Sequence, residues 1–158
     1  MVPLPVRIYR HWIGYVAILL AGALTIGLLW VGFLSFATTP GIDHVFAFQL
    51  AFVTITVVLA ITVIQLYVYS LSYIDLSEEG IRIKNWVTLF VSKDELFEWT
   101  KVSRATAALG GFFGQILDYG VISIETSGGS IQASMKTIPR VEYWQNQIQL
   151  KADQFPTI

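Results

Sequence analysis

The sequence predicts a membrane α-helical hairpin joined to a small, mainly β domain that ends in a helix. The chain of 158 residues is 54% hydrophobic and has a mean hydropathy of +0.62, which is too apolar for an ordinary soluble domain. The excess lies in residues 12–71, where Asp43 is the only charged residue. We therefore divide the chain into an N-terminal segment (1–11), two transmembrane helices with their connection (12–72) and a β domain (73–158).

Two uncharged runs define the hairpin, residues 12–36 and residues 45–71. As a helix, the first run is about 37 Å long, enough to cross a hydrocarbon core of about 30 Å. Pro40-Gly41 ends a helix in the short connection, so the two helices are expected to be antiparallel neighbours. No ionisable side chain lies near the middle of either run, which favours an anchor over an ion transporter.

The basic residues near the span ends predict the orientation. Arg7 and Arg10 precede the first span, Arg82 and Lys84 follow the second, and the connection contains no Lys or Arg. By the positive-inside rule, both termini are expected in the cytoplasm.

Two other interpretations of the apolar runs are open. Ser35-Phe36-Ala37 has the form of a signal-peptidase site, but the run before it exceeds the ~7–15 residues of a signal peptide, and a second run follows. Both runs also fit buried helices of a soluble bundle, although uncharged runs of this length are rare there.

Residues 73–137 have the pattern of short strands. Residues 73–77 and 81–85 predict a hairpin, 86–91 a third strand, and 95–107 a less regular one. In residues 120–126, Ile122 and Ile124 alternate with polar or smaller side chains, and a turn at 127–129 leads to a strand at 130–137. We count six or seven antiparallel strands.

The last element has helical spacing. Val141, Trp144 and Ile148 recur at three- and four-residue steps, which predicts an amphipathic helix over about 139–152 that covers one end or face of the sheets.

Three segments together resemble the bacterial pleckstrin-homology-like (PH-like) domains of small membrane-anchored proteins. They are the strand-turn pair from Tyr73 to Ile81, the segment LGGFFGQILDYGVISIETSGG at 109–129, and Ile138-Pro139 before the final helix. The resemblance implies two antiparallel sheets with about seven strands, closed by a C-terminal helix, in a multi-pass protein of the bacterial inner (plasma) membrane. The Pro usual before the fourth strand of that family is absent from residues 91–96.

The residues do not suggest catalysis, so we predict a protein that is not an enzyme, with no catalytic residue, metal site or cofactor. The absence of Cys excludes disulfides and thiolate chemistry. His11 and His44 flank the first predicted span and cannot act together. Gly110, Gly111 and Gly114 lack the Lys-Ser/Thr of a phosphate-binding loop, so we predict a flexible loop there.

That loop is the first candidate interaction site. It contains four apolar side chains among three glycines: Phe112, Phe113, Ile116 and Leu117. Three placements are open, namely insertion into the membrane interface, contact with a partner, or burial in the core of the domain.

The second candidate is a lipid-headgroup patch of Arg82, Lys84, Lys101 and Arg104. Residues 73–158 contain eight basic and ten acidic side chains, so the domain as a whole is not attracted to anionic lipid.

We expect a non-enzymatic protein that acts through protein–protein interaction, as an accessory or assembly subunit of a larger membrane complex. Its expected partners are membrane lipids around the hairpin and other membrane-protein subunits or copies of itself. The net charge of −1 does not favour nucleic acid. The alternative function is a module that senses lipid headgroups.

Overall fold

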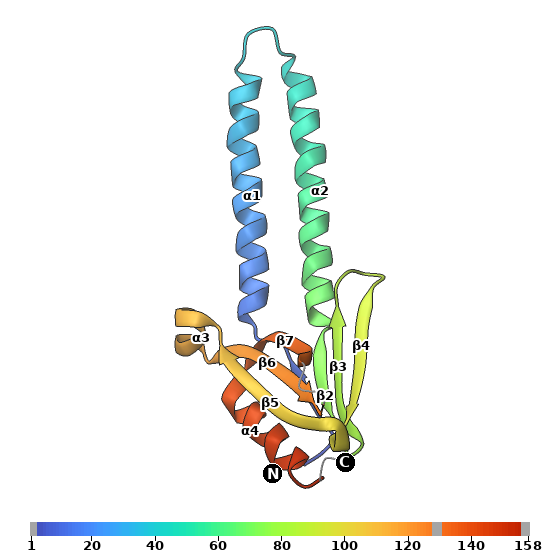
Figure 1. Ribbon diagram of the computed structural model, residues 1–158. Coiled ribbons are helices and arrows are strands. Elements are labelled where there is room, and N and C mark those ends of the chain that lie inside the picture. Colours follow the sequence, from blue (N-terminus) through green and yellow to red (C-terminus); the bar gives the residue numbers. More distant parts are fainter. Residues whose placement is uncertain (1–2, 128–130, 156–158) are drawn as a thin grey trace. The chain divides into compact units, whose positions relative to one another are not determined.

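The computed structural model describes residues 3–127 and 131–155, which form two compact units (Figure 1). One unit is Ile13–Tyr67 and contains most of two long helices. The other unit combines the chain up to Trp12 with the chain from Val68 onward, and we call it the β domain. Each unit is described by itself below.

The helical unit confirms the two predicted apolar helices. Helix α1 is Ile13–Ala37 and helix α2 is His44–Ser70, within one residue of the predicted bounds. Both are long and apolar enough to span a membrane, and their side chains are exposed along most of their length. A core helix of a soluble bundle would instead be mostly buried, so that alternative does not fit.

The two helices approach closely at Gly22. A Cβ atom on Gly22 would lie 2.7 Å from the Oγ1 atom of Thr62 in α2, whereas a Cβ atom on Gly27 would meet nothing within 4 Å. The hydroxyl of Thr62 donates to the backbone oxygen of Val58 in its own helix, so the polar group is satisfied. Small residues at helix contacts are typical of membrane hairpins.

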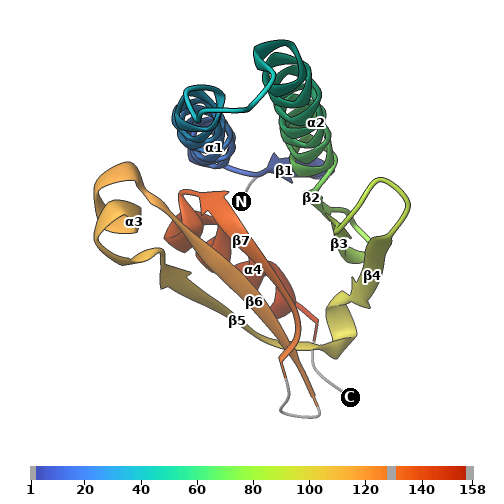
Figure 2. The same ribbon diagram turned by 90° about the horizontal axis from the view of Figure 1, so that it is seen from above.

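The β domain contains two antiparallel sheets and a C-terminal helix, as predicted, and a second, short helix that was not predicted. Sheet A has the order β1-β2-β3-β4 and sheet B the order β5-β6-β7 (Figures 1 and 2). The strands are β1 Val6–Tyr9, β2 Tyr73–Leu76, β3 Gly80–Trp86, β4 Ser92–Glu98, β5 Val102–Leu109, β6 Tyr119–Thr126 and β7 Ile131–Pro139. The short helix α3 is Gly111–Leu117, the C-terminal helix α4 is Val141–Ala152, and a 3-10 turn at Trp99–Lys101 joins the sheets.

Strand β1 comes from the N-terminal segment, which lies far from the rest of the domain in sequence. It pairs antiparallel with β2, so that Tyr9 lies opposite Tyr73 and Val6 opposite Leu76. Ile8 of β1 is buried in the core of the domain. The domain is therefore assembled from chain segments that precede and follow the helical unit in the sequence.

Other elements differ in detail from the sequence pattern. The apolar run 86–91 is not a strand, because β3 ends at Trp86 and residues 87–91 turn the chain into β4. The irregular stretch 95–107 divides into β4, the 3-10 turn and β5. Pro139 ends β7 instead of beginning α4. The predicted turn at 127–129 lies largely outside the described residues.

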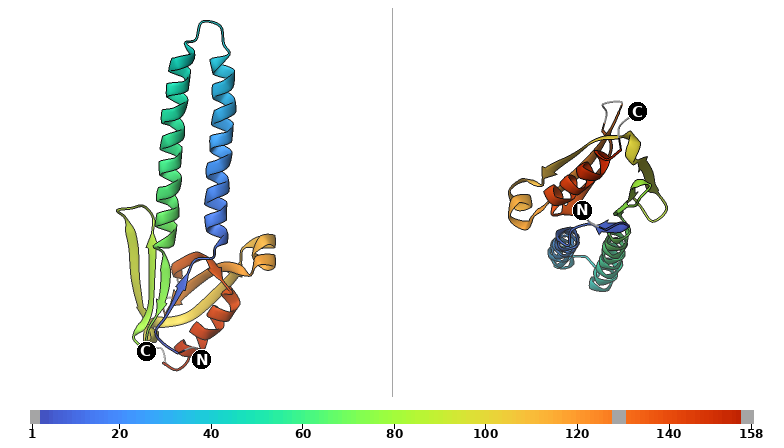
Figure 3. Two further views of the ribbon diagram at one scale, coloured as in Figure 1. Left: turned by 180° about the vertical axis from the view of Figure 1, so that it is seen from behind. Right: turned by 90° about the horizontal axis from the view of Figure 1, so that it is seen from below.

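The core lies between the sheets and α4. The alternation predicted for residues 120–126 is confirmed, since Ile122 and Ile124 are fully buried. Val141, Trp144 and Ile148 form the buried face of α4, which lies along sheet B (Figure 3). Two polar side chains of α4 also contact the backbone of β5: Gln149 accepts from the Ala105 N–H and Gln145 donates to the Ala105 oxygen.

Candidate functional site

Most of the segment 109–117 folds into helix α3 (Gly111–Leu117), not into the predicted flexible loop, and Leu109 is the last residue of β5. Its glycines allow close packing against Tyr119: a Cβ on Gly114 would lie 2.7 Å from the Tyr119 oxygen, and one on Gly110 would lie 2.6 Å from the Tyr119 ring. The helix begins after Gly110 and ends at Asp118, which has a left-handed backbone conformation with φ of 51°. Any larger side chain at Gly110 or Gly114 would push α3 away from Tyr119, so these glycines determine how the β5–β6 connection packs.

The apolar side chains of α3 point away from the core. Phe112, Phe113 and Ile116 are 72%, 66% and 62% exposed, whereas Leu117 is half-buried. The rings of Phe112 and Phe113 contact each other edge to face, with centroids 5.8 Å apart. Burial in the core is thus excluded for three of the four predicted residues, and contact with a partner or a membrane remains.

A second apolar projection was not predicted from the sequence. Residues 87–91, which we call the β3–β4 tip, expose Val87 and Val91, and Phe90 is 92% exposed. The backbone N–H groups of Val87 and Thr88 both donate to the Val91 oxygen, and the Thr88 hydroxyl accepts from the Val91 N–H. The only sequence signal was a run of strand-forming residues that stops at the polar segment starting with Ser92.

Both projections lie at the end of the domain where β1 ends and β2 begins, which we call the junction end. On sheet A, Lys84 pairs with Tyr73, so β3 runs toward this end, and the Trp86 N–H donates to the Ser72 hydroxyl at 3.0 Å. The β3–β4 tip therefore starts beside the first residues of β2.

Sheet B brings α3 to the same end. The N–H of His11, two residues after β1, donates to the oxygen of Thr137 in β7 at 2.6 Å. The His11 ring also contacts the ring of Tyr119, two residues after α3, with centroids 5.5 Å apart. Figure 2 shows α3 and the β3–β4 tip on either side of the end of β1.

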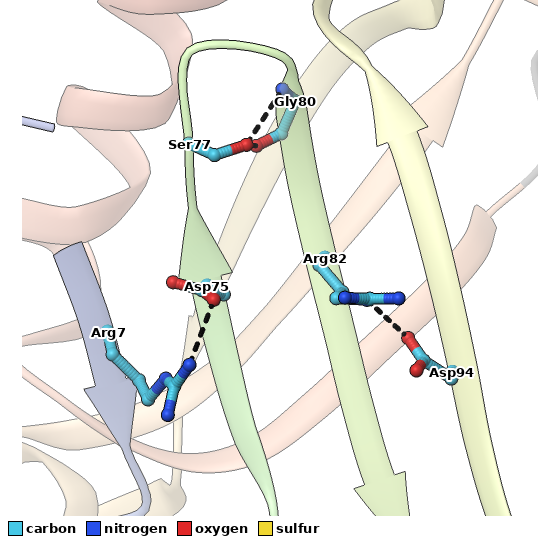
Figure 4. Close-up of polar contacts among 6 residues, drawn as sticks. All are labelled: Arg7, Asp75, Ser77, Gly80, Arg82 and Asp94. Atoms are coloured by element: carbon cyan, nitrogen blue, oxygen red, sulfur yellow. Dashed lines mark hydrogen bonds and ion pairs between the residues drawn. The ribbon is translucent and has the colours of Figure 1, made fainter. Parts of the chain in front are cut away.

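The four predicted headgroup-binding residues are not gathered into one patch. Arg82 and Lys84 lie on β3, whereas Arg104 lies on β5 of the other sheet, opposite Glu125. Arg82 donates from Nε to Asp94 at 2.9 Å (Figure 4), and Lys101 forms an ion pair with Glu98 at 3.2 Å. Neighbouring carboxylates thus compensate two of the four charges, and headgroup binding stays a prediction.

The outer face of sheet A shows the same local compensation. Arg7 of β1 donates to Asp75 of β2 at 3.2 Å (Figure 4). The Arg7 guanidinium also lies over the ring of Tyr73, 4.3 Å from its centroid. Exposed pairs of this kind contribute little to stability, but they leave few unbalanced charges for a ligand.

The edges of the two sheets differ in how they are covered. Within the described residues, β4 pairs only with β3, so its other edge presents backbone groups to solvent. Strand β5 is also an edge strand, but α4 packs on it and its glutamines contact the backbone of Ala105. Leu96 projects from the open strand β4 and is exposed.

Hollows are found in each of the two units. One of about 470 Å³ lies along the apolar helices and is lined by side chains such as Leu28, Phe33 and Leu50. In the β domain, a polar hollow of about 230 Å³ beside Asn85, Lys93 and Glu95 is smaller than typical ligand pockets of about 300–1,000 Å³. Another, of about 310 Å³, is bordered by the ion pair between Lys151 and Glu78.

Titratable groups of the described residues are not gathered into a metal site. Over residues 3–127 and 131–155, there is no group of three or more His, Asp or Glu side chains close enough to hold a metal ion. His11 is 8% exposed, and its burial lowers its pKa below the ordinary value, an effect that the nearby Asp118 carboxylate partly opposes.

A comparison of the chain with protein-family models, curated proteins and solved structures found no match. The exposed surfaces that the structure offers as candidate sites are the open edge of β4 and the two apolar projections at the junction end.

Proposed function

We propose that this chain is a non-enzymatic, membrane-anchored PH-like protein that acts through protein–protein interaction, as an accessory or assembly subunit of a larger membrane complex. The proposal places the β domain at the cytoplasmic face of a bacterial inner membrane. The observation that carries it is the open edge of β4.

Two features support membrane anchoring. In water, α1 and α2 would expose far more contiguous apolar surface than soluble proteins tolerate. The pairing of β1 with β2 requires that the chain return to the side from which it started, as two spans do. Cleavage after Ala37 would remove β1 and with it the buried Ile8, so the pairing also favours an uncleaved first helix.

The edge of β4 suits a partner that adds a strand. An open edge offers backbone N–H and C=O groups for such a partner, and the side chains along it provide selectivity. The edge carries Lys93, Asp94 and Glu95, and charged side chains of this kind discourage unspecific strand pairing. A specific partner therefore has to contact Leu96 and match the charges on both sides of it.

The test is purification of the full-length chain from its native membrane in mild detergent, with Leu96→Asp and Leu150→Asp compared to the wild type. Both leucines are about half exposed, but Leu150 lies on α4, away from the open edge. We expect a protein to co-purify stoichiometrically with the wild type and with Leu150→Asp, and to be lost with Leu96→Asp.

The proposal would be abandoned for a different result. If the protein purifies alone, binds anionic but not neutral liposomes, and loses this binding when Arg82 and Lys84 are replaced by Gln, headgroup sensing is its function. A phosphatase or fluorescent reporter after Ile158 tests the cytoplasmic orientation separately.

A further inference from the structure

We propose that the β domain docks on the bilayer that holds its own helices, by inserting the β3–β4 tip and helix α3 into the interfacial region. This inference rests on the proposed membrane anchoring, but not on the proposed protein partner. The edge of β4 that carries Leu96 takes no part in it.

The first observation is the character of the two projections. Residues 86–91 and 109–117 contain no ionisable side chain, although 21 of the 158 residues of the chain are Asp, Glu, Lys or Arg. Phe90, Phe112 and Phe113 are largely exposed in both segments. Apolar segments of this kind lose unfavourable water contact when they enter the boundary between headgroups and acyl chains.

The second observation is their position. Helix α1 begins four residues after Tyr9, and α2 ends three residues before Tyr73. A chain spans at most about 3.6 Å per residue, so the junction end lies within about 14 Å of both helix ends, whatever the orientation of the two units. Both projections lie at this end, as the contacts of Trp86 and Tyr119 establish.

Two further features favour the bilayer over a protein as the occupant. Tyr9 and Trp12 are also exposed at the junction end, and such amphipathic aromatic side chains are enriched at membrane interfaces. A protein partner would have to compete with a membrane surface that the chain itself keeps within reach. The excess of acidic over basic residues in 73–158 makes general attraction to anionic headgroups unfavourable, so docking is expected to depend on apolar insertion.

The experiment uses single cysteines, because the natural chain has none and each introduced thiol is labelled uniquely. Phe90→Cys and Phe113→Cys report on the two projections. Glu79→Cys is the water-exposed control, in the turn at the opposite end of β2 and β3, and Leu28→Cys, on the exposed surface of α1, is the lipid control. Each full-length variant carries a nitroxide and is placed as a single copy in a nanodisc of neutral phosphatidylcholine.

Two accessibilities of the nitroxide are measured, one to oxygen, which concentrates in lipid, and one to a water-soluble nickel chelate. The reported ratio is the first accessibility divided by the second. We expect this ratio to be several-fold higher at positions 90 and 113 than at position 79, and to be unchanged at high salt, because apolar insertion is not screened. Adding Phe90→Ser to the chain labelled at 113 should lower the ratio, since both projections insert together. The exposed positions of Phe90 and Phe113 mean that thermal unfolding should be unaffected in these variants.

Other results would overturn the inference in distinguishable ways. Equal ratios at 79, 90 and 113, with a high ratio at 28, would exclude docking and leave the membrane anchor intact. A low ratio at 28 would contradict the anchor itself. Protection of 90 and 113 only with two copies per disc would identify a second copy as the occupant, and protection only in anionic lipid would identify headgroup binding.

Discussion

At the scale of single residues, His11 contacts several elements of the β domain that no motif in the sequence connects. Its N–H donates to Thr137 of β7, its backbone oxygen accepts from the Tyr69 hydroxyl, and its ring contacts the rings of Trp12 and Tyr119. The sequence placed it only at the edge of the first predicted span, because nothing in residues 1–11 predicted a strand. It is a structural residue that joins β1 to sheet B.

Burial of this imidazole makes stability depend on pH. Since its pKa is lower in the folded protein than in the unfolded chain, the unfolded state takes up a proton first as the pH falls below about 6.5. Stability is therefore full above that value and declines until the pH passes the folded pKa. We expect the thermal midpoint of the full-length protein to fall from about pH 7.5 to about pH 5.5 by more than that of His11→Gln. Equal declines in the two proteins would show that His11 is not the group responsible.

Truncating a buried core side chain should destabilise the protein far more than truncating a partly buried one. Ile122 is fully buried between the sheets, whereas Val121 on the same strand faces outward and is only partly buried. Ile122→Ala should reduce the free energy of unfolding by about 2–5 kcal/mol, because the lost contacts leave a cavity. Val121→Ala is the matched control and should cost much less in chemical denaturation. If Ile122→Ala lowered the free energy of unfolding as little as Val121→Ala, the core would lie elsewhere.

At the scale of elements, packing of the two long helices depends on the contact between Gly22 and Thr62. Gly22→Leu should separate the helices or force the Thr62 side chain to move, at a cost of about 1–3 kcal/mol. Gly27→Leu is the control, since nothing lies within 4 Å of the new Cβ. Disulfide formation between cysteines placed on facing positions of α1 and α2, in detergent, should slow in the first variant only. Equal rates would show that the glycine is not a packing contact.

Some of these elements could be predicted from the sequence and others could not. The two long helices were predictable because their uncharged runs are long enough to span a membrane. Strand β6 and helix α4 were predictable because each has a period of its own and buries one face. Strand β1 was not, because four residues next to an apolar run carry no period, and its pairing with β2 spans the whole hairpin. Helix α3 and the β3–β4 tip were missed because their form depends on close approaches to Tyr119 and Ser72 that only the folded chain contains. The four basic residues could be named but not placed, since sequence does not tell which carboxylate each one meets.

At the scale of the whole molecule, the β domain is complete only with both of its chain segments. Because Tyr9 and Tyr73 lie opposite each other, a short flexible Gly/Ser linker in place of Ile13–Tyr67 should leave the domain folded. Deleting residues 1–12 from that protein should lower its thermal stability markedly, since Ile8 leaves the core and β2 becomes an edge. Circular dichroism melts of the two proteins check this. Identical melting would mean that β1 contributes nothing to the domain.

Strand β1 has a consequence for biosynthesis. It leaves the ribosome before both long helices, whereas its partner β2 follows only after they have been made. If only one helix were threaded through the membrane, β1 and β2 would lie on opposite sides and sheet A would lack its first strand. In the proposed membrane-anchored protein, a complete β domain therefore requires that both helices be inserted. A chain with only one inserted helix would expose the edge of β2 and lack Ile8 in its core, and proteases could recognise both defects.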